Sequence, residues 1–162
     1  MRAKSLRLIV LVFGVLALGL LSTAAYADDP TVRIPGGCQG GKASVPAGSS
    51  LTLVSGWAMA TRGNTQDFAN AATGVMTING QSVTPVQSDV FALPMDSEPL
   101  DGWRVQWSYT TVAPAVGQSM VVTFTIVLAR AVADHEFGIG KPAIIPAGQM
   151  FSPPFACTVT GI

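Results

Sequence analysis

The sequence predicts an all-β fold, an antiparallel β-sandwich of seven or eight strands. Charged residues make up only 11% of the chain, while 17 glycines and 11 prolines supply turn positions. This composition favours strands and turns over surface helices. Several segments alternate apolar and polar residues, as strands with one buried face do. Turn signals separate these segments, which is typical of a sandwich, with a barrel as the alternative.

The first 27 residues have the layout of a secretory signal peptide. Three basic residues precede an apolar run over 8–21, and Ala25-Tyr26-Ala27 is a small-x-small cleavage site. The run is shorter than the roughly 20 residues of a spanning helix. We therefore expect a signal peptide over 1–27 and a single exported domain over 28–162, located at the cell surface, in the periplasm or in the medium. An uncleaved membrane anchor is the alternative.

The charge of the mature domain limits its partners. Cleavage removes three basic residues and no acidic one, so 28–162 carries a net negative charge. A protein that follows nucleic-acid phosphates needs a basic face, which argues against nucleic acid as a ligand. We expect an extracellular protein or a glycan as partner, and membrane contact only through an uncleaved signal segment.

The two cysteines, Cys38 and Cys157, are predicted to form one disulfide, because an isolated pair in an oxidising compartment is most simply bridged. Neither lies in a C-x-x-C motif or beside a histidine, which argues against a metal or redox site. The bridge would tie the N-terminal segment to the last strand.

The N-terminal half of the domain contains two predicted strands and one short helix. A strand is expected over 31–34, followed by a turn-rich segment over 40–48. The alternation over 50–59 predicts a longer strand. The polar segment 61–74 contains a helix of one or two turns, which Asn64 would cap because an acidic residue follows three positions later.

A hairpin is predicted next. One strand covers 74–78 and another begins at Gln81, with Asn79-Gly80 between them. Both turn residues tolerate positive φ, so this pair is a strong hairpin signal. A further short strand is expected over 90–93.

The clearest strand runs over 102–110. Its aromatic and β-branched side chains alternate with polar ones. We therefore expect Val105 and Trp107 to be buried, and Arg104 and Gln106 to face solvent.

The rest of the chain is expected to form two more strands and a long loop. The apolar, β-branched run over 118–132 predicts a central strand, with a buried helix as the alternative. The segment 133–154 is rich in glycine and proline and reads as a loop that packs on the core or binds something. A last strand over 155–162 would place Phe155, Cys157 and Val159 on the same face.

The predicted architecture is similar to that of immunoglobulin-like sandwiches. In antibody domains the disulfide joins two core strands around a buried tryptophan. Here the cysteines lie on the first and last elements. The similarity is therefore one of architecture alone.

The acidic segment before the strand over 102–110 is the candidate ligand site. Asp96, Glu98 and Asp101 lie close together and next to Trp103. Several carboxylates on a loop suit Ca²⁺, although the spacing is not that of an EF-hand. Two of them could instead serve a glycosidase, or all could be solvated. No other cofactor is expected.

The remaining candidate groups are one histidine and several aromatic residues. His135 lies between two acidic residues and has no nucleophile motif to serve. The aromatic residues form either a platform for a sugar or peptide, or part of the core. They are Trp57, Trp103, Trp107 and Tyr109.

These observations predict a non-enzymatic binding or adhesion module whose contacts come from the loops over 94–101 and 133–154. A structural subunit joined by edge-strand pairing is the first alternative. A small hydrolase is the second.

Overall fold

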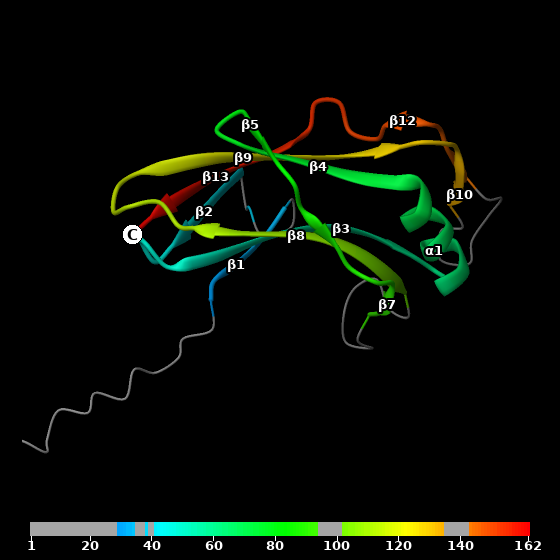
Figure 1. Ribbon diagram of the computed structural model, residues 1–162, viewed down its shortest axis with the longest axis horizontal. Helices are drawn as coiled ribbons and strands as arrows, with labels where there is room; N and C mark the ends of the chain where they lie inside the picture. Colours follow the sequence, from blue (N-terminus) through cyan, green and yellow to red (C-terminus); the bar gives the residue numbers. More distant parts are fainter. Residues whose placement is uncertain (1–28, 35–37, 39–40, 94–101, 135–142) are drawn as a thin grey trace, which may run out of the picture.

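In the computed structural model, two β-sheets pack face to face, with one helix at an end of the sandwich (Figure 1). The structure describes residues 29–34, 38, 41–93, 102–134 and 143–162. The fold is mostly β, which confirms the all-β, two-sheet prediction at that level. The predicted signal segment over 1–27 lies outside the described residues.

The first sheet has the order β1-β3-β8-β6, and β7 also pairs with β8. The long antiparallel pair β3 and β8 forms its centre. Its strands are β1 (Thr31–Arg33), β3 (Ser50–Met59), β6 (Val86–Gln87), β7 (Phe91–Ala92) and β8 (Trp103–Val112).

The second sheet has the order β2-β13-β9-β4-β5, and β12 also pairs with β9. A separate two-stranded sheet joins β10 and β11. Together these strands are β2 (Lys42–Val45), β4 (Ala72–Ile78), β5 (Gln81–Val83), β9 (Ser119–Leu128), β10 (Val132–Asp134), β11 (Ala143–Ile145), β12 (Gly148–Gln149) and β13 (Phe155–Gly161).

Both main sheets are mixed, so the prediction of a purely antiparallel sandwich is wrong. β1 runs parallel to β3, and β2 runs parallel to β13. Side-chain alternation identifies the buried face of a strand but not the direction of its neighbour. The described residues also contain more strands than predicted, because short ones form in the segments 40–48 and 133–154 that were expected to be turn or loop.

The core lies between the two sheets and confirms the predicted inward faces of the long strands. Val105 and Trp107 are buried as expected. Arg104 and Gln106 lie on the opposite face but are half-buried rather than open to solvent. The reason is the neighbouring strand β3, whose Gly56 leaves room for the Arg104 side chain to lie on the sheet. The largest fully buried side chains also include Phe68, Phe124, Ile34, Leu51, Leu53, Met59, Met76 and Ile126.

The single described helix, α1 (Arg62–Ala71), links the two sheets. Its cap is Thr61, whose side chain accepts a hydrogen bond from the Asn64 amide at 3.2 Å. The predicted cap at Asn64 is therefore wrong by one turn, and the helix of 10 residues is longer than expected. Phe68 is fully buried and anchors the helix to the core.

The predicted hairpin at Asn79-Gly80 is confirmed. Asn79 has φ 50° and Gly80 has φ 80°, and the turn joins β4 to β5. The Asn79 side chain also accepts a hydrogen bond from the Val121 amide at 2.9 Å, which fixes the turn to β9.

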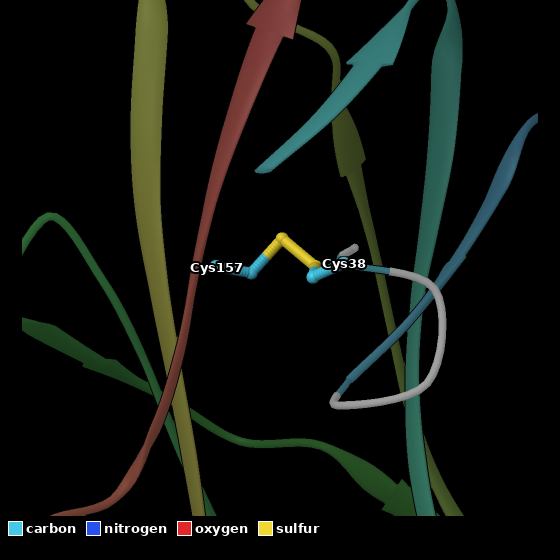
Figure 2. Close-up of a disulfide and its surroundings, with 2 residues drawn as sticks. All are labelled: Cys38 and Cys157. Carbon is cyan, nitrogen blue, oxygen red and sulfur yellow. A yellow bond between two sulfur atoms is a disulfide. The ribbon is translucent and has the colours of Figure 1, made fainter. Parts of the chain in front are cut away.

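The predicted disulfide joins Cys38 to Cys157, with their Cα atoms 5.8 Å apart (Figure 2). Cys157 lies on β13 and is buried. The bridge thus attaches the segment between β1 and β2 to the last strand. Over the described part of the chain, no helix is long and apolar enough to cross a bilayer.

Candidate binding site

Most of the predicted acidic site cannot be placed. Asp96, Glu98 and Asp101 lie outside the described residues, as does His135. The structure therefore leaves both the Ca²⁺ and the glycosidase readings untested. Over the described ranges, no three His, Cys, Asp or Glu residues come together as metal ligands would.

Trp103, the fourth predicted site residue, begins β8 and is half-buried. The Arg62 guanidinium lies 5.5 Å from the centre of its ring, in a cation–π arrangement. Thr65 also donates a hydrogen bond to the Trp103 carbonyl at 3.3 Å. The Arg62 side chain from α1 occupies one face of the indole, so that face is not a free platform for a sugar.

The four aromatic residues singled out in the sequence do not form one platform. Trp107 is buried in the core against Phe124, with ring centres 6.0 Å apart. Tyr109 and Trp103 pack at the edge of the core. Only Trp57 lines a pocket at the helix end of the sandwich.

This pocket, called the aromatic pocket below, has a volume of about 280 Å³. Its walls are mostly apolar, and two polar side chains, Asp134 and Gln149, complete them. The apolar lining consists of Trp57, Ile145, Pro146, Met150 and Phe151. Apolar walls with a few polar groups are the usual composition of a ligand site.

A stack of aromatic rings holds the wall of the aromatic pocket in place. Trp57 stacks on Phe68 of α1, with ring centres 5.9 Å apart and planes 22° apart. The Phe151 ring also lies near Trp57, with ring centres 6.0 Å apart, and Phe151 in turn packs on Phe155 at 4.3 Å. Contacts with two aromatic rings fix the indole of Trp57, so a ligand would meet a rigid surface.

Hydrogen bonds anchor the segment that carries Phe151. The Phe151 carbonyl accepts from Thr125 Oγ1 at 3.3 Å and from the Gln149 side-chain amide. The Met150 amide donates to the Ile126 carbonyl at 2.9 Å. The segment 148–151 thus continues the second sheet beside β9, whereas the sequence suggested a loop that packs on the core or binds something.

The Trp57 indole contributes an unsatisfied donor. Its Nε1 atom is buried and has no hydrogen-bond partner among the described residues. A buried donor without an acceptor is costly, and such atoms are rare in folded proteins. We therefore infer that the packing around Trp57 is not optimised for stability alone.

A second pocket of about 310 Å³ opens at the side of the sandwich, between β4, β5 and β8. Gly74 and Trp107 form part of its floor, and Val83, Pro85 and Gln87 part of its walls. Gln87 is already bonded to the Ala69 carbonyl at 3.1 Å. No charged side chain lines this pocket, so we assign it no ligand.

One surface ion pair is present near the aromatic pocket. Arg130 contacts both carboxylate oxygens of Asp67, with Nη1 3.2 Å from Oδ2. Hydrogen bonding to Arg130 lowers the pKa of Asp67; burial opposes this shift, and the positive charge of Arg130 adds to it. Both side chains are about half exposed, so the pair joins α1 to the segment after β9 without forming a buried charge site.

Comparison with protein-family models, with curated proteins and with solved structures finds no match for this chain. The case for a function therefore depends on the geometry described above.

Proposed function

We propose that this chain is an exported, non-enzymatic binding module of immunoglobulin-like architecture, and that it takes a sugar or a peptide side chain in the aromatic pocket. The observation that carries the proposal is the rigid, largely apolar pocket formed by Trp57 and Phe151 with Gln149 and Asp134 at its wall. Apolar and aromatic walls suit the apolar part of a sugar ring or peptide side chain, and amide and carboxylate groups suit hydroxyls and amides.

Two features support export. The signal-like layout of 1–27 is one. The other is the disulfide between Cys38 and Cys157, since such bonds are typical of oxidising compartments.

The strand orders support the immunoglobulin-like architecture. Immunoglobulin domains place strands A, B, E and D in one sheet and C, F and G in the other. Counted along the chain, β1-β3-β8-β6 corresponds to the first order, and β13-β9-β4 to the second. The helix between β3 and β4 and the position of the disulfide are departures from that pattern.

Assembly by edge-strand pairing has weaker support. The edge strands β1, β2, β5, β6 and β7 have 3, 4, 3, 2 and 2 residues, so each offers few main-chain hydrogen bonds to a partner. Short edges are one way in which sheets avoid such pairing.

Adjacent residues on β11 provide a matched test. Ile145 lines the pocket, whereas Ile144 is 69% exposed. Ligands would first be identified on glycan and peptide arrays, with and without Ca²⁺, and affinities then measured by titration calorimetry. Ile145→Ala should weaken binding about fivefold through lost apolar contact, and Ile144→Ala should leave it unchanged.

Equal effects of the two substitutions would place the ligand elsewhere and overturn the proposal. Binding that requires Ca²⁺ and is lost on Glu98→Ala would point to the acidic segment instead. Turnover of a glycoside or ester by the purified chain would reject the non-enzymatic assignment.

A further inference from the structure

Arg104 occupies an unusual position on the outer face of the first sheet, away from the aromatic pocket. Its Nε atom is buried and has no hydrogen-bond partner among the described residues. A Cβ atom on Gly56 would lie only 2.9 Å from that nitrogen. The Arg104 side chain therefore lies flat across the glycine of β3, and the missing side chain at position 56 makes room for it.

A second arginine lies on the same outer face. In the register of β1 and β3, Arg33 is opposite Val54, and in that of β3 and β8, Arg104 is opposite Ala58. Val54 and Ala58 are an even number of residues apart on one strand, so both arginines project from the same side of the sheet. Burial, and then the positive charge of Arg33, lower the pKa of Arg104.

Neither arginine forms an ion pair among the residues that the structure describes. The ion pair found there is that of Arg130 with Asp67, and Arg62 is placed over the ring of Trp103. Apart from Arg104, the outward-facing residues on the central strands β3 and β8 are uncharged. They include Thr52, Val54, Gly56, Ala58, Gln106, Ser108 and Thr110.

This arrangement is unfavourable without a ligand. Two like charges lie on the same face, on the two strands that flank β3, and one of them is partly removed from water with an unsatisfied donor. An oxyanion between them would replace the repulsion by two attractions. A guanidinium held in one orientation also loses little freedom when it binds a carboxylate or a sulfate group.

We propose that Arg33 and Arg104, with Gly56 as the floor, form a binding site for an oxyanion group, a carboxylate or a sulfate, on an extracellular ligand. The site is separate from the aromatic pocket. It does not depend on the function proposed for that pocket.

The first test is an NMR titration of the exported, disulfide-bonded protein. Sodium sulfate and sodium acetate serve as probes, with sodium chloride at equal ionic strength as the reference. The side-chain Nε–H signal of Arg104 should shift and saturate with sulfate or acetate, and should not saturate with chloride. Absence of saturation with both oxyanions would overturn the proposal.

Three variants separate a specific site from general attraction of anions. Arg33→Gln and Arg104→Gln should each weaken binding about tenfold, as the loss of a charge-assisted hydrogen bond would. Lys42→Gln removes the same charge from the exposed edge strand β2 of the other sheet, and should leave the affinity unchanged. An equal loss of affinity in all three variants would show that the net charge alone causes the effect, and would reject the site.

Two further measurements complete the test. Arg33 is exposed, so Arg33→Gln should keep the melting temperature of the parent and remain informative even where Arg104→Gln unfolds. Arg104→Lys keeps the charge but loses the planar fork, and should bind as weakly as Arg104→Gln. A shift of the Arg104 signal on Asp101→Asn, with no anion added, would identify the chain's own acidic segment as the counter-charge and overturn the proposal.

The source of the oxyanion is decided by short oligosaccharides. Sulfated dextran fragments, galacturonate oligomers and neutral dextran fragments would be compared on the parent and on Arg33→Gln. Preferential binding of the sulfated dextran fragments indicates a sulfated ligand, and preferential binding of the galacturonate oligomers indicates a carboxylated one. Equal binding of the neutral fragments would show that the arginines do not select charge.

Discussion

Substituting Gly74 by alanine should test how tightly the two sheets are packed. Gly74 lies on the inner face of β4, opposite the Trp107 ring of the other sheet. An added Cβ would approach Cγ and Cδ1 of that ring to 2.6 Å. Trp107 is 2% exposed, so its ring cannot move away into solvent. Either the ring or the β4 backbone must shift by several tenths of an ångström.

The expected size of the effect follows from two opposing contributions. Overpacking of a well-filled core costs about 1–3 kcal/mol. Replacing glycine by alanine raises the free energy of unfolding by about 0.4–1 kcal/mol, because the unfolded chain loses conformational freedom. The net expectation is a decrease of about 1–2 kcal/mol in the free energy of unfolding.

Denaturant unfolding followed by tryptophan fluorescence measures this loss. Gly63→Ala is the control, because position 63 lies in α1 with no atom within 4 Å of the added Cβ and should become more stable by up to about 1 kcal/mol. In a Trp107→Phe background the cost of Gly74→Ala should shrink, since the smaller ring leaves space. An unchanged or raised stability of Gly74→Ala alone would show that the ring relaxes into the adjacent pocket, and would refute the argument.

Three other perturbations have definite expected outcomes. Thr61→Ala removes the cap of α1 and should cost about 1 kcal/mol in denaturant unfolding. Replacing Cys38 and Cys157 by alanine opens a loop of 119 residue steps and should lower stability by up to about 5 kcal/mol, measured against the oxidised parent. Arg130 lowers the pKa of Asp67 in the folded state. The ionised carboxylate therefore contributes its full stabilisation above its unfolded pKa of about 3.9. This stabilisation is lost as the pH falls through the lower pKa of the folded state. The difference in melting temperature between the parent and Asp67→Asn should therefore disappear in that acidic range; a difference that persists at still lower pH would contradict the assignment.

Sequence alternation predicts the buried faces of this fold well, for a physical reason. Successive side chains of a strand point to opposite sides, so Val105 and Trp107 must share a face whatever the strand pairs with. The positive φ values of Asn79-Gly80 are likewise a local property of these two residues. Both features could be predicted because they do not depend on distant parts of the chain.

Strand partners and directions depend on distant parts of the chain. The parallel pairing of β1 with β3 and of β2 with β13 joins segments that carry no mutual signal in the sequence. The helix start was misplaced because both Thr61 and Asn64 are residue types that can cap a helix. In the structure the Thr61 carbonyl accepts the first helical hydrogen bond, from the Thr65 amide at 3.1 Å, so the helix begins three residues earlier than expected.

The candidate binding surface was predicted only in part. The segment 133–154 does supply most of the aromatic pocket, as expected of a long segment rich in glycine and proline. Its apolar residues Met150 and Phe151 were the available signal, because such residues in a glycine- and proline-rich segment must pack against something. The rest of the pocket could not be predicted, since Trp57 reaches it from another sheet.

The arginine pair shows why register matters more than exposure in finding a site on a β-sheet. In the sequence, Arg104 is one of several polar residues that alternate with a buried aromatic face, and it carries no special signal. Two neighbours distinguish Arg104 from the other polar residues of β8. Gly56 on the adjacent strand leaves room for its side chain to lie flat on the sheet, and Arg33 lies one strand further on. These relations exist only once β3 is inserted between β1 and β8. An outward-facing residue thus acquires a binding role from the strands beside it, and its own local sequence would not predict one.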